Sequence, residues 1–141
     1  MAILSESRAS LRFGGDALDP DEVTALLGHP PTLGRRKGEP TRRTPAGAAV
    51  PARTGIWLLK ASPRSPGDLD AQVAELLGGL TSDRAIWQDL RGRFRADLFC
   101  GLFMEKSNEG LTLSARTLQV LGERGLELDL DIYGPVGDAS E

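Results

Sequence analysis

Apolar and polar residues alternate along two segments of the chain, one near each end. The first segment carries its apolar residues at alternate positions: Ala9, Leu11 and Phe13. In the second, apolar residues from Leu126 to Ile132 alternate with acidic residues. A period of two is typical of a strand that buries one face. We therefore expect a strand at each end of the fold, with the apolar side of the last strand in the core.

Opposite charges lie on the polar sides of these two predicted strands. The first carries Arg8 and Arg12, and the last carries a row of three carboxylates: Glu127, Asp129 and Asp131. Side chains two positions apart on a strand are separated by about 6.6 Å, too far for all three to reach one metal ion without another element. Opposite charges on paired strands are mutually stabilising. We therefore expect the first and last strands to be neighbours, and no metal site.

Two other runs are apolar on both sides, which indicates interior strands. Residues 55–59 read Gly-Ile-Trp-Leu-Leu, and residues 97–104 form the most apolar run of the chain. Near-continuous apolar runs are typical of strands that are covered on both faces. We expect a central strand over 97–104, in which Cys100 is a small buried hydrophobe rather than a nucleophile.

A helix-entry pattern occurs twice, at residues 18–23 and 113–118. In each copy a capping residue, Asp19 or Ser114, stands between two apolar residues at the spacing of a hydrophobic staple. Each copy also follows one predicted strand and precedes another, as in a degenerate strand-helix-strand repeat. Two helices are therefore expected to bury Val23 and Leu118, the inner residues of the staples, and the second helix is also expected to turn Leu121 inward.

Two further helices are expected between the interior strands. Asp68 can cap a helix in which Val73 and several leucines form one apolar stripe that ends near Gly78. A shorter helix should run from about Ser82 to Leu90.

The order of these elements predicts the class of the fold. Each helix must lay its apolar stripe on a sheet, which gives a two-layer α+β sandwich. We expect a single domain over residues 1–141, with helices packed on a mostly antiparallel or mixed sheet, and ferredoxin-like topology is the specific expectation. Residues 135–141 are expected to form a disordered tail.

Between His29 and Thr54 the chain is rich in Pro, Gly, Ala, Thr and Arg. A short strand is expected over 32–36. The stretch 38–54 has too few apolar residues to compensate for the entropy of ordering, so we interpret it as a flexible basic loop within the domain. The local excess of positive charge, together with His29, supplies the predicted binding residues: Arg35, Arg36, Lys37, Arg42 and Arg43.

The composition of the chain limits where in the cell the protein is expected and which kinds of site it can contain. The net charge is −3, and the single cysteine excludes an intrachain disulfide and C-x-x-C motifs. The start of the chain lacks the features of a secretory signal, and no stretch approaches the ~20 apolar residues of a membrane span. We therefore expect a cytoplasmic protein that does not bind membranes. Because no glycine-rich nucleotide loop or H-E-x-x-H motif occurs, no cofactor is expected.

Three functions remain open at this point. The first is a non-enzymatic regulatory or toxin-neutralising domain that binds another protein, or a second copy of itself, through the basic loop and an exposed sheet edge. The second is a small enzyme or anionic-ligand-binding domain that uses His29, the one histidine, with Arg36 or Lys37. The third, nucleic-acid binding through the basic loop, is disfavoured because that loop has no interleaved aromatic residue and the chain is acidic.

Several short segments, spread over most of the chain, carry a family resemblance. They are Leu11–Phe13, Leu18–Gly28, Pro31–Thr32, Arg36–Gly38, Gly55–Trp57, Asp97–Cys100 and Leu128–Tyr133. In these segments the chain resembles a bacterial family of small domains known as domain of unknown function 4279. The resemblance implies a single-domain cytoplasmic bacterial protein and brings no known activity with it.

Overall fold

The protein has a five-stranded mixed sheet in a computed structural model that describes residues 2–43 and 45–135. The strands of this sheet, in the order in which they lie side by side, are β3 (Leu33–Arg35), β6 (Gly55–Lys60), β2 (Glu6–Gly15), β7 (Arg95–Phe103) and β9 (Glu127–Tyr133). The helices are α1 (Pro20–Leu27), α2 (Leu69–Gly78), α3 (Arg84–Arg93) and α4 (Ala115–Glu123). The predicted α+β class is confirmed.

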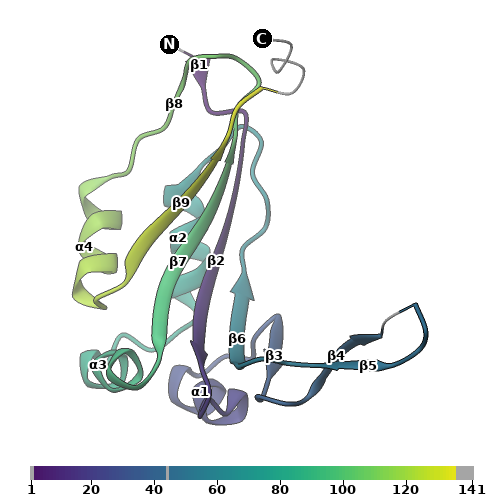
Figure 1. Ribbon diagram of the computed structural model, residues 1–141. Helices are drawn as coiled ribbons and strands as arrows, with labels where there is room; N and C mark the ends of the chain where they lie inside the picture. Colours follow the sequence, from purple (N-terminus) through teal and green to yellow (C-terminus); the bar gives the residue numbers. More distant parts are fainter. Residues whose placement is uncertain (1, 44, 136–141) are drawn as a thin grey trace.

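The helices cover one face of the sheet (Figure 1). On β2, the residues on the helix side are buried while Arg8, Ser10 and Arg12 on the opposite side are partly or fully exposed. The core lies between the two layers, where Phe13 is in contact with two tryptophans, Trp57 of β6 and Trp87 of α3. We call the other side of the sheet, which carries no helix, the open face.

The connections form two split strand-helix-strand units. Helix α1 joins β2 to β3 with β6 between them, and α2 and α3 join β6 to β7 with β2 between them. All neighbouring strands among these four are antiparallel. This is the β-α-β-β-α-β order of a ferredoxin-like unit. Strand β9 extends this unit by pairing parallel to β7. The two copies of the expected strand-helix-strand repeat therefore differ, because α4 connects adjacent strands whereas α1 connects strands that are separated by β6.

The first and last strands of this sheet are not neighbours, so that prediction was wrong. Strand β7 lies between β2 and β9. Arg12 pairs in register with Asp97 of β7, and its guanidinium lies 2.8 Å from that carboxylate and 3.5 Å from Asp129 of β9. Arg12, which was expected to pair with the acidic side of β9, is therefore paired mainly with a carboxylate of β7, the strand that lies between β2 and β9. Strand β7 has a neighbour on each side, as expected for an interior strand, and β2 is the middle strand of the five.

The two stapled helices differ in what they bury. In α1, Leu18 and Val23 are both buried and the Asp19 carboxylate accepts the N–H of Asp21, as expected. In α4, Ser114 caps the helix but Leu118 is 54% exposed, contrary to the prediction. The helix turns Leu121 inward, as expected, together with Thr117.

Asp70 of α2 accounts for this rotation of α4. Its carboxylate accepts hydrogen bonds from the Thr117 hydroxyl at 2.6 Å and from the Ser114 N–H at 3.0 Å. Both donors belong to the first turn of α4 or to its cap. Because these hydrogen bonds hold the Thr117 side of α4 against α2, Leu118 is left on the outer side of the helix.

The apolar side of β9 is only partly in the core, which also differs from the prediction. Leu126 is buried and Leu128 packs against the core, but Leu130 and Ile132 are 42% and 58% exposed. Strand β9 is at the edge of the sheet and packs against α4. The second half of the strand therefore keeps an uncovered apolar side.

The predicted basic loop contains two strands that the sequence pattern did not indicate. Strands β4 (Pro40–Arg43) and β5 (Ala49–Pro51) pair antiparallel and project away from the main sheet (Figure 1). Strands β1 (Ala2–Ile3) and β8 (Glu109–Gly110) form another small pair, parallel in direction. Of the predicted tail, positions 136–141 lie outside the described residues.

Candidate functional site

Strand β9 presents an edge without a neighbouring strand in the described part of the chain. Its sides differ in chemistry: one carries three carboxylates, while Leu130 and Ile132 project from the other. The strand contains no proline or lysine, two of the devices that usually keep an edge from pairing. The edge is therefore able to hydrogen-bond another strand, with acidic groups along one side.

Aromatic rings meet the acidic side of this edge. Tyr133 stacks on Phe103 of β7, with ring centroids 4.9 Å apart and planes 5° from parallel. The Tyr133 hydroxyl donates a hydrogen bond to Asp131 at 2.5 Å, which raises the pKa of Tyr133. This stacking holds the end of β9 against β7 through side chains, so the backbone groups on the outer edge of β9 remain free of this contact.

Arginines and aromatic rings alternate across the open face. Arg12 makes two parallel hydrogen bonds of 2.8 Å to Asp97, and its guanidinium also lies 4.3 Å from the ring centre of Phe99. The hydrogen bond to Asp97 raises the pKa of Arg12 despite its partial burial. Arg8 lies 5.6 Å from the ring centre of Phe103 in the same way. Such contacts hold the arginine side chains flat against the sheet.

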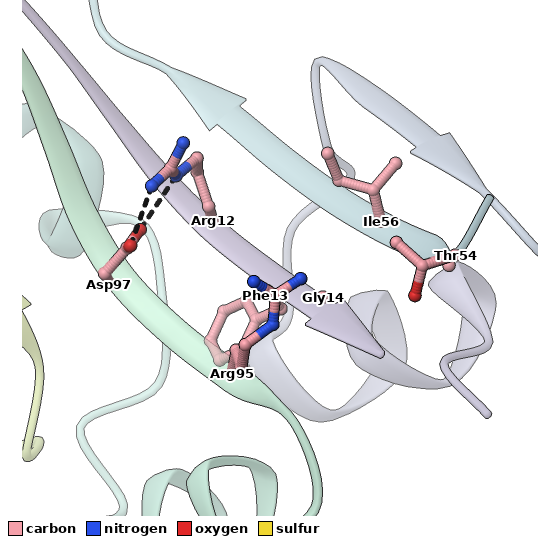
Figure 2. Close-up of a pocket in the computed structure, with 8 residues that line it drawn as sticks. Arg12, Phe13, Gly14, Thr54, Ile56, Arg95 and Asp97 are labelled. Atoms are coloured by element: carbon pink, nitrogen blue, oxygen red, sulfur yellow. Dashed lines mark hydrogen bonds and ion pairs between the residues drawn. The ribbon is translucent and has the colours of Figure 1, made fainter. Parts of the chain in front are cut away.

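A hollow of about 140 Å³ opens beside the Arg12–Asp97 pair (Figure 2). Its floor is Gly14, which faces Ile56 on one side and Arg95 on the other in the strand register. Figure 2 shows the Arg95 side chain extending from β7 toward Gly14, with Thr54 and Ile56 across the hollow. Arg95 has no ion pair or hydrogen bond within the described residues.

The basic residues predicted to bind a ligand are partly neutralised within the chain. Arg36 lies 2.7 Å from Asp19 and 3.4 Å from Asp21, and Lys37 lies 3.2 Å from Asp16. The hydrogen bond from Arg36 lowers the pKa of Asp19, and that from Lys37 lowers the pKa of Asp16. The contacts link β3 and the turn after it to the start of α1.

Of the other predicted arginines, one ends β3 of the main sheet and two lie in the projecting hairpin. The Arg35 guanidinium donates to the carbonyl oxygens of Pro40 at 2.9 Å and Thr41 at 3.4 Å, so it braces the start of β4. Arg42 and Arg43 are residues of β4, paired with Val50 and Ala49.

His29 lies apart from Arg36 and Lys37. It follows α1, whereas Arg36 contacts Asp19 at the beginning of this eight-residue helix, so the helix length of about 12 Å separates them. The Nδ1 of His29 donates to the carbonyl oxygen of Pro30 at 2.6 Å. The imidazole borders a small hollow near Lys60 and Glu75. The structure thus does not bring together the residues of the second functional hypothesis.

Cys100 is a core residue, as predicted. Its side chain is completely buried between the sheet and the helices, and this burial raises its pKa to about 12. Within residues 2–43 and 45–135, no three His, Cys, Asp or Glu side chains gather in the way a metal ion requires. None of the helices described is both long and apolar enough to cross a bilayer.

Comparison with known protein families matches residues 5–135 to the family described as "Domain of unknown function (DUF4279)". The chain belongs to this family. The match covers the whole main sheet and all helices of this DUF4279 domain, from β2 to the end of β9. No curated protein and no solved structure matches the chain.

The hollow and Arg95 were missed by sequence reasoning in this DUF4279 chain. Gly14 directly follows the alternating segment that ends at Phe13, and Arg95 lies before the run that predicted the central strand. A glycine inside a strand can mark a close approach of another group, and that signal was present at Gly14. Its partner could not be identified because β7 is distant in the sequence.

Proposed function

We propose that this chain is a non-enzymatic protein-binding domain that takes an extended segment of a partner polypeptide onto the β9 edge. The observation that carries the proposal is the uncovered outer half of β9, where Leu130 and Ile132 are largely exposed beside a row of carboxylates. An exposed edge of this kind binds peptides by adding a strand, since main-chain hydrogen bonds give affinity and alternate side chains give specificity.

The two sides of β9 define the chemistry of the partner. A strand added beside β9 presents every second side chain to the acidic side and the others to Leu130 and Ile132. Cross-strand pairs of opposite charge stabilise a sheet, and like charges destabilise it. The segment that fits is therefore extended and alternates basic with apolar residues.

The same charges disfavour two other partners. Pairing β9 with β9 of a second copy would set two acidic rows side by side, which is repulsive. Nucleic acid requires an excess of positive charge, whereas Arg36 and Lys37 are already paired with aspartates. A regulatory role, including neutralisation of a toxin, would use such strand addition without any catalytic group in this chain.

Peptide binding to the full chain tests the proposal. The probe is a fluorescent peptide of seven residues, matching the length of β9, that alternates lysine with valine. A second peptide has the same composition with the lysines grouped at one end. We expect a saturable rise in fluorescence anisotropy for the alternating peptide and a much weaker one for the grouped peptide.

A matched pair of variants locates the binding. Asp131→Lys reverses a charge on β9, and Asp89→Lys makes the same change on α3. We expect the first to weaken binding by about tenfold and the second to leave it unchanged. Equal affinities for the two peptides, or equal effects of the two variants, would overturn the proposal.

A further inference from the structure

We infer that the hollow beside Gly14 is a binding site for a single carboxylate group on a short aliphatic stem, with Arg95 as its anchor. The site lies at the β6, β2 and β7 strands of the open face rather than at the β9 edge. The inference therefore stands independently of the strand addition proposed above.

The first step of the argument is the charge on Arg95. The neighbouring Arg12 donates from Nε and Nη2 to Asp97, so those two charges compensate each other. Arg95 has no such partner within the described residues. A guanidinium offers five N–H donors in a planar fork that matches the two oxygens of a carboxylate. One uncompensated cation thus borders the hollow.

The second step is the space that Gly14 leaves. A Cβ added at Gly14 would lie 3.3 Å from Nη2 of Arg95, tighter than ordinary van der Waals contact. Ile56 of the neighbouring strand β6 is partly buried and forms an apolar wall across the hollow from Arg95. The missing side chain therefore lets the Arg95 guanidinium lie low over the sheet, with an apolar surface close by.

Size and charge select the class of ligand. At about 140 Å³ the hollow is below the roughly 300–1,000 Å³ typical of pockets for cofactors and drug-sized ligands. A group with two charges, such as phosphate, would meet one free cation and the carboxylate of Asp97 on the rim. A monoanionic carboxylate balances Arg95 alone, and its methylene groups can contact Ile56.

A titration of the ¹⁵N-labelled full chain tests the site. Propionate is the probe, propionamide is the uncharged control of similar shape, and inorganic phosphate tests the class. We expect propionate to shift the backbone amide signals of Gly14, Thr54, Ile56 and Arg95 in a saturable way, and phosphate to bind more weakly. Equal shifts with propionamide, or tighter binding of phosphate, would overturn the inference.

Three variants separate the anchor from general charge effects. Arg95→Gln removes the cation, Gly14→Ala fills the floor, and Arg116→Gln removes an exposed cation on α4. We expect the first two to weaken propionate binding by about tenfold or more, and the third to have no effect. Dispersed amide signals in each variant report that it is folded. Unchanged affinity in Arg95→Gln would contradict the site.

The source of the carboxylate is distinguished by two peptides. A short peptide that ends in a free carboxylate and its amidated form are titrated in the same way. If the peptide with the free carboxylate binds more tightly than propionate, the natural ligand is a polypeptide C-terminus. If the two bind with equal affinity, the natural ligand is a small free acid. Both results support the carboxylate site, whereas binding of the amidated peptide as tightly as the free form would contradict it.

Discussion

Ser7 of β2 and Gln72 of α2 are both completely buried, and the Ser7 hydroxyl donates to Oε1 of Gln72 at 2.7 Å. The Nε2 of Gln72 donates in turn to the carbonyl oxygens of Ser7 and Ser62. The Ser7 hydroxyl also accepts the N–H of Asp68, the N-cap of α2. A polar network thus fixes α2 on the central strand, with every polar atom of Gln72 satisfied.

Gln72→Leu should destabilise the fold by about 1–3 kcal/mol, because it keeps the volume but leaves buried partners without hydrogen bonds. The free energy of unfolding in urea measures this. Gln119→Leu on the exposed side of α4 is the control and should change it by less than about 0.5 kcal/mol. Similar small effects of the two variants would contradict the network's role.

Leu121→Ala should cost about 2–5 kcal/mol, whereas Leu118→Ala should cost less than about 1 kcal/mol. Both leucines are on α4, but Leu121 is 3% exposed and Leu118 is 54% exposed. The comparison tests the rotation of α4 with the same chemical change at two positions. A larger loss from Leu118→Ala would restore the orientation that the staple pattern predicts.

Asp70 should make the stability depend on pH. Hydrogen bonds from the Thr117 hydroxyl and then from the Ser114 N–H lower the pKa of Asp70 in the folded protein. The carboxylate therefore contributes stability above its unfolded pKa of about 3.9, and this contribution is lost as the pH falls through the lower folded value.

Asp70→Asn measures that contribution. At about pH 7 the variant should be less stable than the wild type by about 1 kcal/mol, since its hydrogen bonds no longer involve a charge and the site is open to screening by water. The difference should shrink as the pH falls well below about 4. Urea unfolding across this range is the measurement, and a constant difference would count against the assignment.

Cys100 should react with a thiol reagent only when the protein unfolds. The thiol is buried, and its pKa is raised to about 12, so very little thiolate exists near neutral pH. Labelling should be slow in buffer and fast in concentrated urea. Rapid labelling of the folded protein would place Cys100 at an accessible position.

Local patterns predicted local structure well. The alternation around Leu11 located β2, and the staple around Asp19 located α1, because the residues that form these features are close in sequence. Leu118 shows where such prediction fails. The staple pattern around it correctly predicted the cap of α4, but the rotation of α4 is decided by the Asp70 carboxylate on another helix. Such a contact leaves no periodic signal in the sequence.

The predicted pairing of β2 with β9 failed for a related reason. Asp97 and Asp129 are equivalent by charge, and only the strand order decides which of them meets Arg12. The basic segment was recognised by composition, yet its pairing with Asp16 and Asp19 depends on how β3 packs beside α1. Charge patterns predicted that ion pairs would form and not which residues would form them.

Amide hydrogen exchange along β9, with and without the alternating lysine-valine peptide, tests the central claim most directly. If the edge takes an added strand, outward N–H groups in residues 127–133 should exchange more slowly with the peptide bound, by about tenfold or more, while those of α1 should not change. Unchanged exchange along β9 at a peptide concentration that saturates the anisotropy signal would contradict the account.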